Sequence, residues 1–474
     1  MVNRIPVPQA KYELLNSVHQ SRWKSPVICL TLVFIIVGSL FFLRAWLDIL
    51  SPRNLESGPL SSVIIAFEDA TIAAWARRAR MYAESTKENQ NADRNTTVTT
   101  SELSSNASTS KIVVCYFTIP GVLNTSKELS PAHIDPDICT HIIVGFASVV
   151  NCNLSLGANS EIYQEVVNLK KLQPKLKVMI SAGGINELNY GFPEMVKTHA
   201  NRKQFIRSVL NITKVYNFDG LDIDWEFPAW LGGNKRETIY YVQLLQELKK
   251  EFVRSGRDLI LSAAVGAPAA IIDASYHVPE IAEHVDFINI MAYDYHYYVW
   301  YLPVTGLNAP LYPGRQETGY LATLNVNYSA MYWVSKGMPK EKIVIGIPTY
   351  GHSYQLYNSL NHEIMAPVKG FGRLGEKGFV YYPTICWFLS IGANKVFDED
   401  SRTLYSYRYD EWISYDDRIS VLEKAEWIKS NGFKGAMLFS LNTDDWNGSC
   451  DDNINITFPL TRTVSDSILK PQVE

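Results

Sequence analysis

The sequence of 474 residues has no excess of basic residues, because 44 Lys and Arg stand against 48 Asp and Glu and the formal net charge is -4. Nucleic acids are bound through positive fields, so this balance argues against a nucleic-acid partner. The six cysteines include no pair at CxxC spacing, which is the spacing typical of zinc and redox motifs. We therefore expect neither a metal nor another cofactor.

Long apolar runs are also scarce, and the one that suggests a membrane span is Val27 to Leu43. Its length is near the lower limit for a transmembrane helix, and residues 45–47 can extend it at the interface. A cleaved signal peptide is the alternative. The long segment before the run, the length of the run and the lack of a small-x-small cleavage site argue against that alternative. We predict a transmembrane signal anchor over residues 27–47.

The segment before the anchor, residues 1–26, is net positive, which predicts that it stays cytoplasmic. The remaining chain of such a single-pass type II membrane protein would be lumenal or extracellular. The N-x-[ST] sequons all follow the apolar run and lie at Asn95, Asn106, Asn124, Asn153, Asn211, Asn327, Asn447 and Asn455. Every cysteine except Cys29 also follows it, which suits an oxidising compartment and leaves one thiol without a partner.

Residues 48–110 are predicted to form a juxtamembrane segment and a stalk. From Glu84 to Ser110 the chain is rich in Ser, Thr, Asn and Glu and has no aromatic residue. A segment of this composition cannot bury enough apolar surface to fold by itself.

From Lys111 onward, short β-rich runs alternate with helical stretches. The runs span residues 111–117, 140–147, 176–184, 218–227, 258–266, 286–294, 342–351 and 434–441. Nearly continuous apolar runs suit strands buried on both faces, and their alternation with helices indicates a parallel sheet.

We predict an α/β fold, a (β/α)8 TIM barrel over residues 111–460, with a C-terminal tail at 461–474. A small α+β insertion domain is expected at about 352–415, between the seventh and eighth strands. A doubly wound open sheet is the alternative. It predicts a glycine-rich phosphate turn after the first strand, and the sequence there has no GxGxxG motif.

Three carboxylates alternate along the fourth predicted strand, Asp222, Asp224 and Glu226. Alternate residues of a strand face the same side, which in a barrel is the interior, and the last one emerges at the mouth where barrel enzymes keep their active sites. Carboxylates crowded there must share protons or have raised pKa values, as a general acid requires. The alternative is an acidic turn on a solvated surface, but Ile223 and Trp225 are interleaved with the acids.

The same stretch, DGLDIDWEF, resembles the DxxDxDxE signature of family 18 glycoside hydrolases, the chitinases and chitinase-like lectins. SAGG at 181–184 resembles the family's SxGG on strand three, and MAYD at 291–294 its MxYD on strand six. Further blocks follow in the family's order, among them TGLNAPLYP, VIGIPTYGHSY and GAMLFSLNTDDWNGSC. The resemblance covers residues 111–460.

The resemblance implies a retaining, substrate-assisted mechanism in which Glu226 protonates the glycosidic oxygen and the substrate's N-acetyl oxygen attacks the anomeric carbon. Asp224 would hold the acetamide N–H and share a proton with Asp222, and Tyr293 would hold the acetamide carbonyl. Asp219 is expected to fix the start of the strand. The other residues implied to line the site are Asp294, Met291, Tyr116, Phe146, Gly183, Gly184, Tyr350 and Phe439. The two glycines would leave room at the mouth, and core packing is an equal alternative for the aromatic residues.

The implied activity is that of a chitinase, an endo-β-1,4-N-acetylglucosaminidase that acts on chitin or chitin oligosaccharides. The resemblance also implies disulfides between Cys115 and Cys139 and between Cys386 and Cys450. It gives Cys152 no partner.

Departures from the family pattern concern the sugar cleft. Phe439 and Ile185 replace usual tryptophans, Pro120 replaces a stacking tryptophan, and His352 replaces a common arginine. Since stacking on aromatic rings contributes about 1–3 kcal/mol per contact at nucleic-acid sites, weaker binding of long crystalline chitin is expected. A chitin-binding lectin with weak or no hydrolysis is the alternative function. A structural ectodomain with a vestigial cleft is a third, and the intact acidic residues argue against it.

Overall fold

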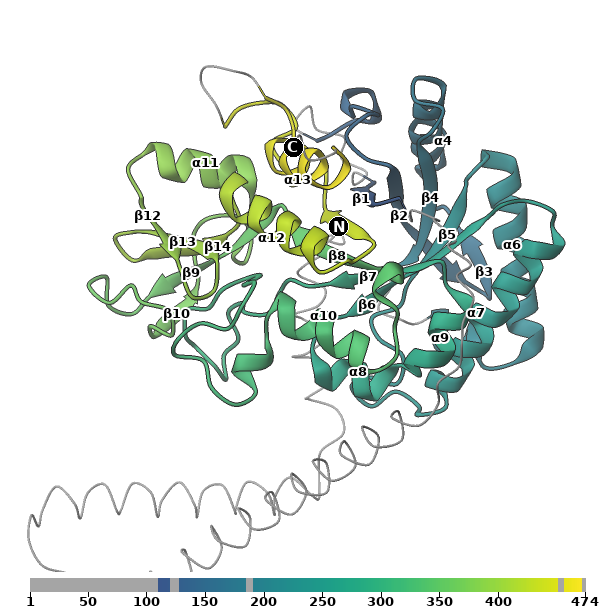
Figure 1. Ribbon diagram of the computed structural model, residues 1–474, viewed down its shortest axis with the longest axis horizontal. Helices are drawn as coiled ribbons and strands as arrows, with labels where there is room; N and C mark the ends of the chain where they lie inside the picture. Colours follow the sequence, from purple (N-terminus) through teal and green to yellow (C-terminus); the bar gives the residue numbers. More distant parts are fainter. Residues whose placement is uncertain (1–109, 120–127, 185–190, 451–455, 471–474) are drawn as a thin grey trace, which may run out of the picture. The chain divides into compact units, whose positions relative to one another are not determined.

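The computed structural model describes residues 110–119, 128–184, 191–450 and 456–470 (Figure 1). The predicted anchor at 27–47, nearly all of the predicted stalk, and both Pro120 and Ile185 lie outside these residues. No helix within the described ranges is long and apolar enough to cross a bilayer.

Parallel strands close into a barrel, as predicted. In spatial order they are β1 (Ile112–Thr118), β2 (His141–Val150), β4 (Lys177–Gly183), β5 (Gly220–Asp224), β6 (Ile260–Gly266), β7 (Phe287–Met291), β8 (Ile343–Pro348) and β15 (Gly435–Phe439). The barrel closes where β15 pairs with β1, with Gly435 opposite Ile112. The short β3 (Asn153–Ser155) pairs antiparallel with the end of β2.

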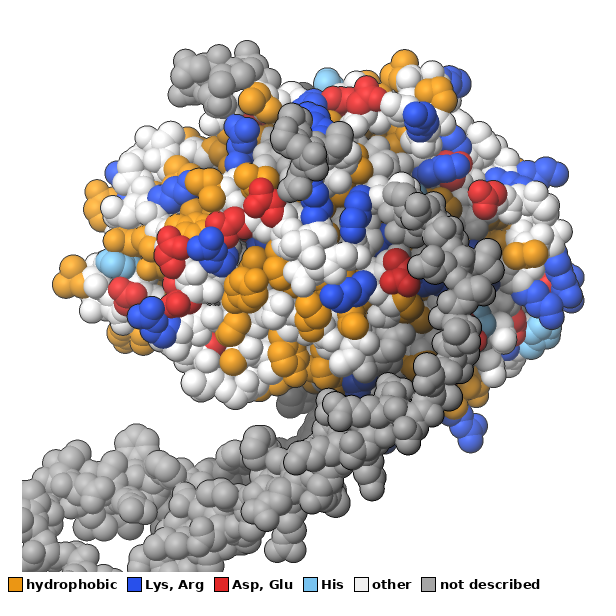
Figure 2. Space-filling model, viewed as in Figure 1, with side chains coloured by type: hydrophobic (Ala, Val, Ile, Leu, Met, Phe, Trp, Pro, Cys, Tyr) orange, Lys and Arg blue, Asp and Glu red, His pale blue; other side chains and the backbone are white. Residues whose placement is uncertain are grey.

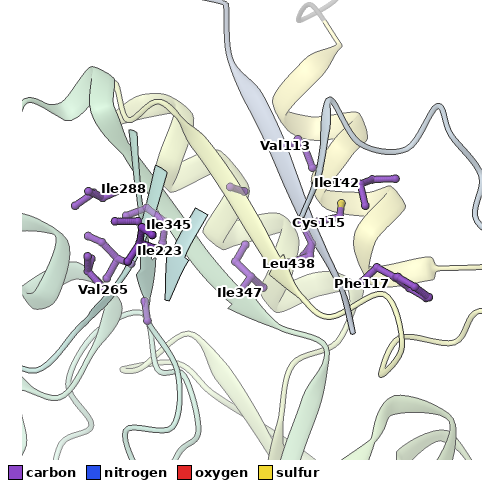
Figure 3. Close-up of a cluster of buried hydrophobic side chains, with 14 of the residues drawn as sticks. Val113, Cys115, Phe117, Ile142, Ile223, Val265, Ile288, Ile345, Ile347 and Leu438 are labelled. Carbon is purple, nitrogen blue, oxygen red and sulfur yellow. The ribbon is translucent and has the colours of Figure 1, made fainter. Parts of the chain in front are cut away.

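The strands form because both of their faces are buried. On β1, Val113, Cys115 and Phe117 join the apolar layer between strands and helices, whereas Val114 and Tyr116 join the cluster inside the barrel. Figure 3 shows part of this outer layer, in which Ile223, Val265, Ile288 and Ile345 gather beside one another. Such two-sided burial explains the nearly continuous apolar runs in the sequence.

Helices cover the outside of the barrel (Figure 1). They are α4 (Ser160–Asn168), α5 (Gly191–Val196), α6 (His199–Tyr216), α7 (Glu237–Arg254), α8 (Ala269–Ser275), α9 (Val278–His284), α10 (Val326–Ser335), α12 (Arg418–Ser430) and α13 (Pro459–Leu469). Side-chain caps fix several of their starts. Thr198 caps α6, Asn325 caps α10, and Asp417 forms a capping box on α12.

The predicted insertion is a second, antiparallel sheet between β8 and β15, seen on the left of Figure 1. Its strands are β9 (Tyr350–Leu356), β10 (Val368–Phe371), β11 (Phe379–Tyr381), β12 (Asn394–Asp398), β13 (Thr403–Arg408) and β14 (Glu411–Tyr415), with helix α11 (Tyr382–Ser390). Because β9 starts just after β8 ends, its first residues lie at the mouth of the barrel.

Two disulfides join the pairs that the resemblance implies, Cys115 with Cys139 and Cys386 with Cys450. Cys152 is a free thiol in the turn between β2 and β3. On the face seen in Figure 2, Lys and Arg side chains are interspersed with Asp, Glu and apolar side chains.

Candidate active site

Asp222 and Asp224 lie on β5 with the alternation expected of a strand, and Glu226 comes after the strand has ended. Asp222 and Asp224 are buried, while their neighbours Leu221 and Ile223 belong to the outer apolar layer. Glu226 follows the end of β5 and is partly exposed. The chain of acids therefore leads from the barrel interior to its open end.

Asp222 is held by side chains from several strands. Its Oδ2 accepts hydrogen bonds from the Tyr116 hydroxyl at 2.8 Å and the Ser181 hydroxyl at 2.7 Å. Its Oδ1 accepts from the Ser262 hydroxyl at 2.6 Å and from Asn289 Nδ2 at 3.4 Å. Burial raises the pKa of Asp222, although these hydrogen bonds oppose the shift. A carboxyl in this position is suited to hold or share a proton.

Sequence reasoning did not single out Ser262 or Asn289, and it noted Ser181 only as part of a motif. The available signal was the placement of these small polar residues inside otherwise apolar strands, β4, β6 and β7. A polar side chain buried in a strand needs a hydrogen-bond partner, and here the partner is the carboxyl of Asp222.

Tyr293 follows β7 and is buried beside the acids. Its pKa is raised well above its usual value, first by burial and then by Asp224, Asp294, Glu226 and Asp222. The phenol therefore stays protonated and can act as a hydrogen-bond donor. The pKa of Tyr116 is raised in the same way, by burial and by Asp222 and Asp224.

Aromatic rings line the interior next to these acids. Phe439, at the end of β15, stacks on Tyr293 with ring centroids 5.8 Å apart and lies 5.6 Å from Tyr116. Tyr116 also approaches Phe146, and Tyr350 lies against Phe379 with centroids 4.3 Å apart. Met291 and Phe146 are partly buried against the same cluster. The aromatic residues of the resemblance are thus brought together, with Phe379 as an unpredicted neighbour.

Gly183 ends β4 and Gly184 follows it, both in backbone conformations that favour glycine, with φ of +114° and +72°. A Cβ on Gly183 would lie 2.1 Å from the Asp224 carbonyl oxygen, and one on Gly184 would lie 2.7 Å from the Phe146 ring. The room that these glycines leave is therefore occupied by the neighbouring strand and by Phe146. Because they have no Cβ, the Asp224 backbone and the Phe146 ring can pack directly against them.

Asp294 takes a left-handed conformation, with φ of +58°, directly after Tyr293. Its backbone N–H donates to Asn308 Oδ1 at 3.0 Å. Its Oδ1 accepts a hydrogen bond of 2.6 Å from the Tyr350 hydroxyl and lies 2.8 Å from His352 Nε2. Tyr350 and His352 both come from β9, so the insertion sheet helps to build the site.

No group of three or more His, Cys, Asp or Glu side chains among the described residues is arranged to hold a metal ion. The groups on hand for chemistry are carboxyls, phenols and a histidine. Such a set supports acid–base catalysis on an uncharged substrate.

Comparison with known proteins gives a consistent result. The family model for Glycosyl hydrolases family 18 matches residues 112–444. Chitinase-3-like protein 2 of Homo sapiens is 37% identical over 375 residues, which make up 75% of this chain and 92% of that protein.

Two examples illustrate the likeness to solved structures. The immunomodulatory active chitinase of Trichuris suis has a TM-score of 0.71 at 33% identity, over 76% of this chain and 100% of that one. Human YKL-39, a pseudo-chitinase with retained chitooligosaccharide binding properties, has a TM-score of 0.70 at 36% identity, over 76% of this chain and 100% of that one. The likeness therefore extends to one protein described as active and one described as a pseudo-chitinase.

Proposed function

The chain belongs to family 18 of the glycosyl hydrolases, and from this membership we propose that it hydrolyses β-1,4-linked N-acetylglucosamine chains. One observation carries the proposal. Asp222 and Asp224 are buried on β5, where hydroxyl groups bind Asp222, and the partly exposed Glu226 follows two residues after the strand ends. A protein that only binds sugar has no need of that arrangement.

In the proposed reaction Glu226 gives its proton to the glycosidic oxygen as the bond to the anomeric carbon breaks. The substrate's acetamide oxygen bonds to that carbon and forms an oxazolinium ion. Water then opens the ring and loses its proton to Glu226, and the product keeps its configuration. Asp224 accepts a hydrogen bond from the acetamide N–H. Asp222 shares a proton with Asp224. The Tyr293 hydroxyl donates a hydrogen bond to the acetamide oxygen.

The stereochemistry of the product tests this reaction. Chitotriose cleaved by the full chain is expected to release the β-anomer first, as observed by proton NMR within the first turnovers. Initial release of the α-anomer would contradict the substrate-assisted mechanism.

The alternative is a lectin for chitin oligosaccharides. One observation that favours it is Phe439, among the aromatic rings that line the site, at a position where family members usually have tryptophan. The other is the retained oligosaccharide binding that is described for human YKL-39. Saturable binding of chitotriose without turnover at any pH would support this alternative. Short, soluble chains are the proposed ligands in either case, because the cleft has fewer large rings for long chitin.

We also propose that the N-terminal run at 27–47 anchors the chain as a type II membrane protein. Asn211 and Asn447 are exposed in the described part of the chain and can accept glycans. Protease added to intact cells should remove the barrel, and a deglycosylating enzyme should lower the apparent mass. A barrel that resists the protease and carries no glycan would contradict the orientation.

A further inference from the structure

The sequence block TGLNAPLYP at 305–313 lies between β7 and α10 and supplies none of the groups in the proposed reaction. Its asparagine, Asn308, is fully buried. Both ends of the Asn308 side-chain amide and both of its backbone polar groups have hydrogen-bond partners. A buried amide that is satisfied in this way holds together the segments that supply its partners.

Two of these partners are the backbone N–H groups that directly follow Tyr293. The Asp294 N–H donates to Asn308 Oδ1 at 3.0 Å, and the Tyr295 N–H donates to the backbone oxygen of Asn308 at 3.0 Å. Asp294 has a φ of +58°, a conformation that residues other than glycine seldom adopt. Asn308 therefore holds the left-handed turn next to Tyr293.

The other two partners of Asn308 belong to the insertion sheet. Its Nδ2 donates to the Tyr350 carbonyl oxygen on β9 at 3.2 Å, and its backbone N–H donates to the Ser414 hydroxyl on β14 at 2.8 Å. The partners also fix the orientation of the amide, because a rotated amide would place donor against donor and acceptor against acceptor. Asn308 thus connects the insertion sheet to the turn after Tyr293.

We propose that Asn308 is a positioning residue for the reaction, which places the Tyr293 hydroxyl at the substrate's acetamide by holding the two peptide groups that follow Tyr293. This inference rests on the proposed hydrolase function. Strand β7 ends at Met291, so Tyr293 lies beyond the part of the chain that the strand pairing fixes. Misplacement of a reacting group by about 1 Å can lower a rate about 100-fold.

The first test is the steady-state kinetics of Asn308→Ala with chitotriose. The substitution removes the acceptor of the Asp294 N–H and the donor to the Tyr350 carbonyl oxygen. We expect kcat to fall at least tenfold, because the acetamide is less well aligned for attack, while KM changes less than about threefold. Thermal unfolding shows whether the variant is folded.

Asn325 is the matched control, because it is another fully buried amide with partners at both ends. Its Oδ1 accepts the Tyr328 N–H at 2.8 Å, and its Nδ2 donates to the Ala322 carbonyl oxygen at 3.0 Å. Its backbone oxygen, which accepts the Tyr295 hydroxyl, is kept in Asn325→Ala. Asn325→Ala should lower the melting temperature as Asn308→Ala does but leave kcat within about twofold. Equal loss of kcat in the two variants would contradict the positioning role.

Ser414→Ala is a milder variant that acts on the same residue. It removes the hydroxyl that accepts the Asn308 N–H and leaves the Asn308 side chain in place. We expect kcat to fall about two- to fivefold with KM unchanged. If Asn308→Ala does not fold, Ser414→Ala decides the question, and the original kcat in that variant would overturn the proposal.

A further test needs no turnover. It compares the binding of chitotriose with that of a thiazoline analogue of chitobiose, whose ring resembles the oxazolinium ion, by calorimetry in a Glu226→Gln background. Asn308→Ala should weaken binding of the analogue at least fivefold more than binding of chitotriose, because misplacement of Tyr293 affects the intermediate most. In Asn325→Ala the two affinities should change in parallel.

The outcomes separate the two proposals. Absence of turnover by the unaltered protein, together with a selective loss of analogue binding in Asn308→Ala, would contradict hydrolysis and keep the role of Asn308. Turnover with the original kcat in Asn308→Ala, and parallel changes in the two affinities, would overturn the role of Asn308 and keep hydrolysis.

Discussion

The Tyr116 hydroxyl donates a 2.8 Å hydrogen bond to Asp222 Oδ2, although β1 and β5 are not neighbours in the barrel. Ser181 and Ser262 bind the same carboxyl from β4 and β6, the strands on either side of β5. The interior of the barrel thus fixes the innermost acid, and through the strand it fixes the positions of Asp224 and Glu226.

Replacement of this acid should affect the reaction more than substrate binding. Asp222→Ala leaves the Tyr116, Ser181 and Ser262 hydroxyls without their acceptor in a dry interior. We expect kcat to fall at least tenfold with KM changed less than threefold, and the free energy of unfolding to fall by about 1–3 kcal/mol. Steady-state kinetics and chemical denaturation check both values.

Asp219 offers a matched control next to the same strand. It lies directly before β5, where its carboxylate accepts a hydrogen bond from the Val178 N–H at 2.8 Å and pairs with Lys170. Asp219→Ala should lower stability but leave kcat within about twofold. An equal loss of kcat in both variants would mean that Asp222 supports the structure of the barrel and has no role of its own in the reaction.

Gly183 should not tolerate a side chain. Its φ is +114°, and a Cβ would lie 2.1 Å from the backbone oxygen of Asp224. Gly183→Ala should lower the free energy of unfolding by about 3 kcal/mol or more, or prevent folding, because backbone strain and a steric clash combine.

Gly370 is the matched control, since no atom lies within 4 Å of its added Cβ and its φ is not in the left-handed region. Gly370→Ala should change the melting temperature by less than about 2 °C. Equal tolerance at both positions would contradict the close approach of β4 and β5 at the site.

Much of this site was predictable from sequence, for a physical reason. Strand alternation places Asp222 and Asp224 on one face whatever the details of packing, and two-sided burial explains the apolar runs. Ser262 and Asn289 stand out in the sequence as polar residues in apolar strands, but their pairing with Asp222 was not predictable, because they are far from it in sequence and meet it only when the barrel closes.

The insertion was visible as a gap between strand runs, but its contribution to the site was not. The spacing of residues could not show that His352 would contact Asp294, which precedes it by a whole barrel strand. The glycines were assigned to the mouth of the site, and the structure places Asp224 and Phe146 against them.

Substitutions of Phe439 test how the aromatic rings of the site contribute to activity. Its ring stacks on Tyr293 and contacts Tyr116, so it borders the residues that would hold the reacting sugar. An indole offers more area and an N–H donor. Phe439→Trp should raise kcat/KM for chitotriose severalfold, and Phe439→Ala should lower it at least tenfold.

The two variants should also be compared on an N-glycan core. If Phe439→Trp lowers activity toward chitotriose while the original protein prefers the glycan core, the pocket is adapted to a different substrate.

The most direct measurement of the central claim is the turnover and binding of chitotriose by Glu226→Gln. The amide keeps the shape of the side chain but cannot give a proton to the leaving oxygen. We expect kcat to fall by about 10²–10⁴-fold, the range that general acid catalysis contributes, with the Kd for chitotriose within about threefold of the original. A Glu226→Gln variant that retains the original rate would contradict the assignment of the acid and the proposed reaction with it.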